Sequence, residues 1–177
     1  MQARPSATCS ERMGMRQSYQ EGSFFAVPLL DGGYGAGLVA RLSPGSKIML
    51  AYLFGPRQDG LPDLAQLASL TAQDAVKVLR VGDMALVSGH WRVLGELEAF
   101  DPAQWPMPQF LRRADALKRA WRVTYSSNDP ARSEREESVP YETVGFEADS
   151  LYGYGSAELL LTKLLVGADH PLNRKSV

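Results

Sequence analysis

The stretch that decides the fold is Gly22-Ser23-Phe24-Phe25-Ala26-Val27-Pro28-Leu29, which Leu30 joins to Asp31-Gly32-Gly33-Tyr34-Gly35-Ala36-Gly37-Leu38-Val39. Two apolar runs flank an Asp-Gly-Gly turn signal, and this pattern is typical of a β-hairpin. Proline has no amide hydrogen to donate to a strand ladder, so the first strand is expected to lie at a sheet edge or to end at Pro28. Gly35 and Gly37 indicate either a bulge or a place where another backbone or an aromatic ring packs closely.

Strand-like runs continue after this hairpin. Residues 47–54 predict a buried third strand that Gly55-Pro56 ends, and residues 75–81 predict another strand after a short helix or turn at 62–67. Residues 84–87 and 91–95 flank Ser88-Gly89-His90 and predict a second hairpin. Because consecutive strands usually pair with one another, an antiparallel meander is the simplest topology.

The second half of the chain mixes strands with loops. Three prolines between Phe100 and Phe110 exclude a regular helix or a central strand there. Residues 121–125 predict a short alternating strand. The polar residues 126–138 predict a solvated loop, and residues 139–144 predict one more strand.

A C-terminal helix completes the expected fold. Residues 156–166 predict an apolar helix, which Ser156 can cap and Gly167 can end. Strands outnumber helices, so the predicted fold class is α+β. We expect a curved antiparallel sheet with the C-terminal helix packed on it, and the sequence allows either an open or a barrel-like sheet.

Length and composition indicate one domain with tails. The chain has 177 residues, of which 45% are hydrophobic and 22% charged, close to the average for a globular protein. We expect residues 1–20 to be a disordered extension, residues 21–167 to be a single α+β domain and residues 168–177 to be a flexible tail. No apolar stretch approaches the roughly 20 residues of a membrane helix, and the N-terminus lacks the apolar core of a secretory signal. A cytoplasmic location is therefore expected, which the single cysteine, Cys9, also suits.

Residues that could carry catalysis are sparse. The two histidines, His90 and His170, fall in an expected turn and in the tail, so no nucleophile with a neighbouring base is apparent. The glycine-rich residues 32–37 lie between two strands and lack the Gly-Lys-Ser/Thr ending of a phosphate-binding loop. No metal-binding or cofactor-binding motif is present. The sequence predicts a non-enzymatic protein with no metal and no cofactor.

Charge is unevenly spread along the chain. The net charge is −1, but residues 126–150 hold 7 acidic and 2 basic residues, a balance of −5. The only basic cluster consists of Arg112, Arg113, Lys118, Arg119 and Arg122, with Trp121 among them. Basic residues interleaved with an aromatic can bind nucleic acid, and the alternative is that they pair with the acidic segment.

Several of these residues together resemble the immunity protein 26 family of bacterial polymorphic toxin systems. The resemblance begins with the two strands quoted above and continues with Gly82-Asp83 and Gly89-His90-Trp91-Arg92-Val93-Leu94-Gly95. Its later part consists of Trp105-Pro106-Met107-Pro108-Gln109-Phe110 and Gly153-Tyr154-Gly155-Ser156-Ala157-Glu158. It spans roughly residues 20–166, and its first half is the more specific.

The resemblance implies a non-enzymatic immunity protein that binds and neutralises a cognate toxin. The acidic segment 126–150 would suit a basic toxin such as a nuclease. Trp105, in the proline-rich connector, suits either the core or an interface. The predicted partner-binding residues are Trp105, Glu134, Glu136, Glu137 and Glu142.

Two other functions remain open on the sequence alone. The first is a nucleic-acid-associated regulator built on a small β-barrel, which would use the basic residues 112–122. The second is an enzyme acting through carboxylates, for which Asp83, Glu96 and Glu158 are the candidates. A clustered basic face would favour the regulator, and two carboxylates converging in a deep pocket would favour the enzyme.

Overall fold

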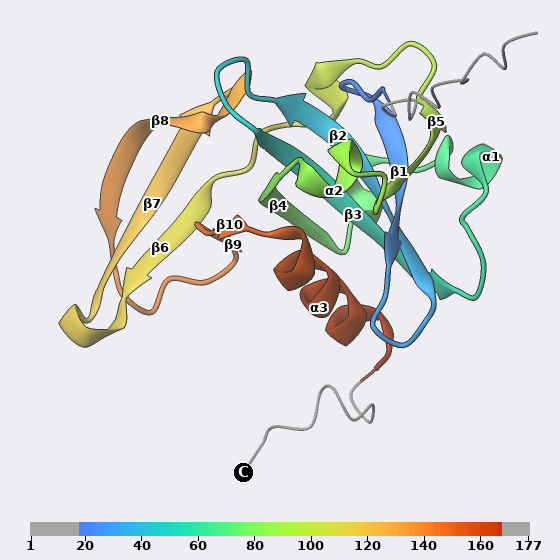
Figure 1. Ribbon diagram of the computed structural model, residues 1–177. Helices are drawn as coiled ribbons and strands as arrows, with labels where there is room; N and C mark the ends of the chain where they lie inside the picture. Colours follow the sequence, from blue (N-terminus) through green and yellow to red (C-terminus); the bar gives the residue numbers. More distant parts are fainter. Residues whose placement is uncertain (1–17, 168–177) are drawn as a thin grey trace, which may run out of the picture.

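The computed structural model describes residues 18–167 and contains two curled, open β-sheets with a helix packed beneath the larger one (Figure 1). The larger sheet has six strands in the order β10-β4-β3-β2-β1-β5. The smaller sheet has four strands in the order β8-β7-β6-β9 and projects to one side. The predicted α+β class and curved sheet are confirmed, and neither sheet closes into a barrel. The predicted tail, and all of the predicted extension except residues 18–20, lie outside the described residues.

The larger sheet is built from β1 (Ser23–Pro28), β2 (Tyr34–Leu42), β3 (Ile48–Gln58), β4 (Lys77–Gly82), β5 (Arg92–Glu96) and β10 (Leu151–Tyr152). The smaller sheet is built from β6 (Phe110–Ala114), β7 (Arg119–Ser126), β8 (Asp129–Val139) and β9 (Glu147–Ala148). The helices are α1 (Leu64–Leu67), α2 (Met84–Val87) and α3 (Tyr154–Leu165). Short 3-10 helices span Ala72–Asp74, Pro102–Gln104 and Asp115–Leu117.

The predicted first hairpin is confirmed, with β1 and β2 antiparallel and Pro28 opposite Tyr34. Since β1 lies between β2 and β5, it is not an edge strand, and Pro28 instead ends it. Gly37 is required by close packing, because a Cβ there would lie 2.3 Å from a ring carbon of Phe25. The pairing of β2 with β3 also shifts register just after Tyr34, so both explanations proposed for the two glycines apply to this strand.

Both faces of the larger sheet are buried, because neighbouring side chains of a strand point to opposite faces. On one face Phe25 stacks on Trp91, with ring centroids 5.2 Å apart, and Leu161 of α3 closes the layer. On the other face Phe24 and Phe54 pack in a cluster with residues of the connector and of the smaller sheet. The second cluster therefore lies between the two sheets.

Two buried arginines attach the smaller sheet to the larger one. Arg41 of β2 is 6% exposed and donates to the carbonyl oxygens of Ser127 and Pro102, at 2.7 and 2.8 Å. Arg80 of β4 is 8% exposed and donates to the carbonyl oxygen of Pro130, at 2.7 Å. Because each guanidinium has several donors, it can satisfy carbonyl groups that would otherwise be buried without partners.

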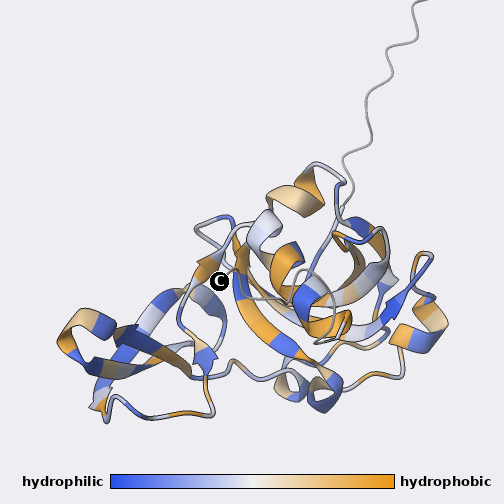
Figure 2. Ribbon diagram, turned by 90° about the horizontal axis from the view of Figure 1, so that it is seen from below, coloured by the Kyte–Doolittle hydropathy of each residue, from blue (hydrophilic) through white to orange (hydrophobic). Residues whose placement is uncertain are grey.

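The structure corrects the prediction of a solvated loop over residues 126–138. This segment forms the turn after β7 and then β8, which pairs with β7 along its length. The charged residues do not prevent strand formation, because β8 is an outer strand whose side chains reach solvent or a charged partner. Figure 2 shows how much of the smaller sheet is hydrophilic.

Four other predictions about individual elements are wrong. Residues 84–87 form the helix α2, since a short apolar run cannot distinguish helix from strand. Of residues 139–144 only Val139 is in a strand, as the last residue of β8, and Pro140 removes a ladder donor after it. The strand β3 continues through Gly55-Pro56 to Gln58. The cap of α3 is Gly153 and not Ser156.

Candidate partner-binding surfaces

Trp105 lies in the core. It is 2% exposed, and its ring meets those of Tyr52 and Phe54 edge-to-face at centroid distances of 5.2 and 6.1 Å. The connector after Phe100 carries Trp105 back onto the larger sheet, where it fills the layer between the sheets. Of the two roles that the sequence allowed for this side chain, the structure shows the core.

The three glutamates of β8 are brought together, and each has an arginine partner. Glu137 lies across from Arg122 on the neighbouring strand. Its Oε2 accepts from both Nε and Nη2 of Arg122, at 3.1 and 2.6 Å. Glu136 forms an ion pair with Arg112, and Glu134 forms one with Arg132 at 3.2 Å. The side chains of Glu134 and Glu136 remain 50% and 44% exposed, and that of Glu137 is 27% exposed.

The hydrogen bond from Arg122 lowers the pKa of Glu137, although partial burial acts in the opposite direction. Arg135 adds a second ion pair to the same carboxylate. Glu137 therefore stays ionised below the usual range of a glutamate, and its charge is balanced by two guanidinium groups. The acidic segment is much less negative on the surface than in the sequence.

The basic cluster of residues 112–122 does not form a free cationic face. Arg112 and Arg122 pair with the glutamates of β8, and Arg113 donates to the carbonyl oxygens of Tyr141 and Thr143. Lys118 lies 4.9 Å from the ring centroid of Tyr141. The arrangement agrees with the alternative in which the basic cluster pairs with the acidic segment.

Glu142 lines an open groove of about 710 Å³ between β6 and residues 141–150. Arg113 and Asp115 line it from one side, and Val144, which is 79% exposed, from the other. The phenol of Tyr141 donates to Asp115 at 2.7 Å and holds the loop against the end of β6. Among the predicted contact residues, Glu142 is the one that lines a hollow of the smaller sheet.

A buried polar cluster at the end of this groove joins the sheets. Arg80 donates to Oδ1 of Asp149 at 3.0 Å and to the phenol oxygen of Tyr125 at 2.6 Å, and its Cζ lies 3.9 Å from the ring centroid of Tyr125. Tyr125 in turn donates to Oδ1 of Asp149 at 2.7 Å. Burial, together with this bond to Asp149, raises the pKa of Tyr125 to about 12. Sequence reasoning missed this cluster, and the available signal was an arginine inside the apolar run at 75–81.

The three carboxylates considered for an enzyme have separate structural partners. Asp83 accepts from the phenol of Tyr19 at 2.5 Å; burial first, and then this bond, raises the pKa of that phenol. Glu158, 7% exposed, accepts from the indole of Trp91 at 2.8 Å and lies 2.6 Å from His90. Glu96 accepts from Gln20 at 2.8 Å. Within residues 18–167 no recorded hydrogen bond joins any two of these carboxylates.

A protein-family comparison identifies the chain. The family model described as immunity protein 26 matches residues 20–122, more than half of the 177 residues. The chain belongs to the immunity protein 26 family. Such immunity proteins are generally non-enzymatic, and membership implies a toxin as the partner in general. No curated protein and no solved structure gives a significant match.

The match has a structural boundary. It covers β1 to β6 and ends inside β7. The strand β8, the segment 141–150 that lines the groove beside β6, and α3 all follow the matched residues. The family model thus describes the larger sheet apart from β10, together with β6 and the first half of β7 of the smaller sheet. In the described part of the chain, no helix is long and apolar enough to cross a membrane.

Proposed function

We propose that this member of the immunity protein 26 family neutralises a cognate toxin by binding it, without catalysis, in the cytoplasm of the producing cell. The observation that carries the proposal is the family membership together with the projecting smaller sheet. This sheet presents an outer strand of charged side chains and an open groove, which is a surface for a protein and not a pocket for a small molecule.

The contact residues that we propose on this sheet are Glu134, Glu136, Glu137 and Glu142. Glu134 and Glu142 are exposed; Glu134 lies midway along β8, and Glu142 follows the end of β8 that is away from the β7–β8 turn. Ion pairs within β8 can exchange for ion pairs with a toxin, so these residues would set the encounter rate and the orientation more than the affinity. A basic toxin such as a nuclease fits this charge. Trp105 is buried, so at this surface it would contribute by packing against the smaller sheet and not by contacting the toxin.

The basic cluster does not support a second function. Two of its arginines pair with glutamates of β8 and a third binds backbone carbonyl groups, so a nucleic-acid regulator has no observation in its favour. The carboxylate enzyme is not supported either, since Asp83, Glu96 and Glu158 hold separate contacts.

The test uses the toxin encoded in the reading frame beside this one, purified as an inactive variant. The wild-type protein should bind it with a Kd in the nanomolar range or below and protect cells that express the active toxin. Replacing Glu134 and Glu142 with lysine should slow association severalfold and reduce its dependence on salt. Asp59→Lys is the control for a single charge reversal, because this side chain follows β3, is 94% exposed, and leaves Arg57 its ion pair with Asp31. Absence of binding by the wild-type protein would overturn the proposal.

A further inference from the structure

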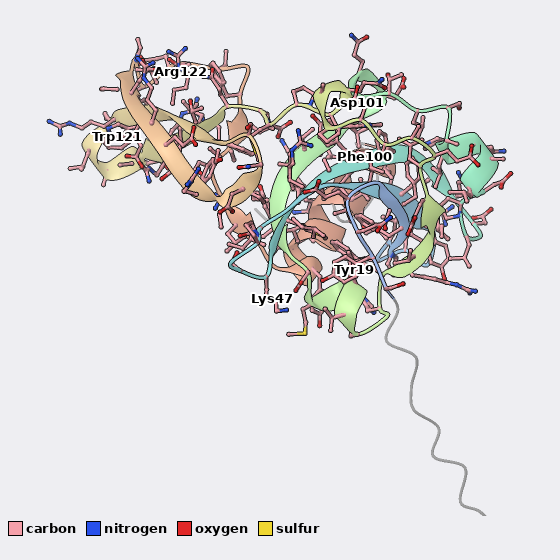
Figure 3. The ribbon with its side chains drawn as sticks, turned by 90° about the horizontal axis from the view of Figure 1, so that it is seen from above. Tyr19, Lys47, Phe100, Asp101, Trp121 and Arg122 are labelled. Atoms are coloured by element: carbon pink, nitrogen blue, oxygen red, sulfur yellow. The ribbon has the colours of Figure 1, made fainter. Side chains whose placement is uncertain are left out.

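Two adjoining hollows lie between α1 and the chain segment that follows β5. The larger measures about 610 Å³, and the smaller about 140 Å³. Ala68, Leu97 and Glu98 line both, so together they form one groove, which we call the α1 groove. The α1 groove belongs to the larger sheet, and Figure 3 shows Asp101 there, well away from Trp121 and Arg122 of the smaller sheet.

The floor of the α1 groove is apolar. Leu64 packs directly on the backbone of β5, since a Cβ on Gly95 would lie 2.4 Å from Leu64 Cδ2. Leu97 continues the floor, and Ala65 and Ala68 leave the wall on the α1 side low and exposed. An aliphatic side chain of a partner could therefore enter without moving the backbone of either wall.

The rim is acidic, and among residues 18–167 its carboxylates have no cationic partner. Glu96, Glu98 and Asp101 line the α1 groove, and no lysine, arginine or histidine of the described residues lines it. None of the ion pairs recorded within residues 18–167 includes any of the three. Their recorded partners are neutral: Gln20 donates to Glu96, and the backbone amide of Ala103 donates to Asp101.

The sequence around the α1 groove strengthens this imbalance. Residues 60–76 and 95–111 contain five acidic residues and no basic residue. One of the five is Asp74, whose pKa the backbone and hydroxyl groups of Thr71 hold below its usual range. The nearest buried cation recorded is Arg41, which donates to three backbone carbonyl oxygens and to no carboxylate. The field in the α1 groove is therefore negative at neutral pH.

The smaller hollow has two further features. Trp105 lines it, and the Nε1 of this buried indole has no acceptor among the described residues. Leaving a buried donor without a partner is unfavourable, so an acceptor oxygen of a bound segment would be stabilised at this position. Ala99, also in the lining, has a φ of 51°, a strained backbone conformation for a residue with a side chain.

We propose that the α1 groove docks an extended basic segment of the partner toxin. An aliphatic side chain of the segment enters between Leu64 and Leu97. Lysine or arginine side chains on either side pair with Glu96, Glu98 and Asp101. This inference rests on the proposed function for the identity of the partner, and it adds a second contact surface, on the larger sheet.

The two contact surfaces differ in what they should do. The glutamates of β8 are already paired, so a toxin contact there exchanges one ion pair for another and adds little affinity. Reversing their charge would still slow the encounter with a basic toxin. The α1 groove has an apolar floor and carboxylates that form no ion pair with the described residues, so a bound segment adds contacts that must be broken on release. Changes on β8 should therefore alter the association rate, and changes in the α1 groove should alter the dissociation rate.

The first experiment blocks the α1 groove. Ala68→Phe places a ring in both hollows from an exposed position, and Gln66→Phe is the control, since Gln66 lies on the same helix outside the lining. Ala68→Phe should raise the dissociation rate of the inactive toxin about tenfold or more, and Gln66→Phe should change it less than about twofold. Glu98→Lys should act in the same direction as Ala68→Phe. Equal dissociation from the wild-type protein and both groove variants would overturn the inference and leave the proposed function standing.

A second experiment does not need the toxin. The probe is the peptide acetyl-Lys-Leu-Lys-Leu-Lys-amide, added to the ¹⁵N-labelled protein and followed by amide chemical shifts, with the corresponding Glu-Leu peptide as control. Shifts should concentrate at Leu64–Ala68 and Glu96–Asp101, and Ala68→Phe should remove them. Shifts confined to β8, or the same shifts with the acidic peptide, would overturn the inference whether or not a toxin binds.

Discussion

The acidic strand β8 and the α1 groove differ in how their charge is used. β8 lies in the most acidic segment of the sequence, with a balance of −5 over residues 126–150, yet each of its glutamates contacts an arginine. The α1 groove has only three carboxylates on its rim, and none of them is in an ion pair recorded within residues 18–167. The net charge of a surface therefore depends on which segments lie side by side in the folded chain, and not only on the charge of one segment of the sequence.

The physical reason is the short range of charge neutralisation. A guanidinium bound to a carboxylate offsets much of its field at larger distances, and salt screens what remains beyond about 8 Å. The arginines of β6 and β7 stand directly beside the glutamates of β8, whereas the α1 groove is built from segments without cations. The larger number of acidic residues thus lies on the less negative of the two surfaces.

The largest effect should come from removing the anchor of the smaller sheet. Arg80→Ala leaves the carboxylate of Asp149, whose side chain is 5% exposed, without its buried partner. We expect a loss of about 3–5 kcal/mol in the free energy of unfolding, measured with urea, because the buried carboxylate keeps only the half-exposed Arg112, 4.0 Å away, as a cationic partner. Arg119→Ala, at an exposed position of β7, should cost less than about 0.5 kcal/mol. A small loss for both variants would show that the sheets are held together without this cluster.

The next prediction compares one charge reversal in each region. Glu137→Lys places a lysine beside Arg122 and Arg135, so the midpoint of thermal unfolding should fall. Glu98→Lys changes charge equally but breaks no recorded ion pair, and its free energy of unfolding should stay within about 0.5 kcal/mol of the wild type. Calorimetry gives both the thermal midpoint and the free energy of unfolding for each variant. A larger fall in the thermal midpoint for Glu98→Lys than for Glu137→Lys would contradict the prediction.

The smallest effect is a pH dependence of the β8 pairing. The pKa of Glu137 is lowered in the folded state, chiefly by the hydrogen bond from Arg122, so its contribution to stability is present above the ordinary glutamate range of about 4 to 5. That contribution is lost as the pH falls through the lowered value. Wild type should therefore be more stable than Glu137→Gln at pH 7, and the gap should close toward pH 3. Urea unfolding of both proteins across this range measures it, and a gap that widens in acid contradicts the prediction.

Local patterns predicted the elements that are held by their own sequence. The hairpin of β1 and β2 needs a turn, two apolar runs and small residues where Phe25 and Leu161 approach, and all of these are visible in the chain. The apolar pattern predicts a helix that starts at residue 156, and α3 starts two residues earlier, at Tyr154. The prediction from the short apolar run at residues 84–87 was wrong, because its pattern suits a helix as well as a strand. In the folded chain these residues form α2, and the backbone amide of Trp91 donates to the carbonyl oxygen of Ala85.

Patterns in the sequence were enough to predict the α+β class, the first three strands, the C-terminal helix and the family. The folded structure was needed to show that β8 is a strand, that its glutamates are paired and that Trp105 is buried. It was also needed to show that Glu96, Glu98 and Asp101 share one groove. The reason is that turns and periodic apolar runs act between near neighbours in the chain. Charge pairing and groove formation instead depend on segments far apart, such as α1 and the residues after β5, which only the folded chain brings together.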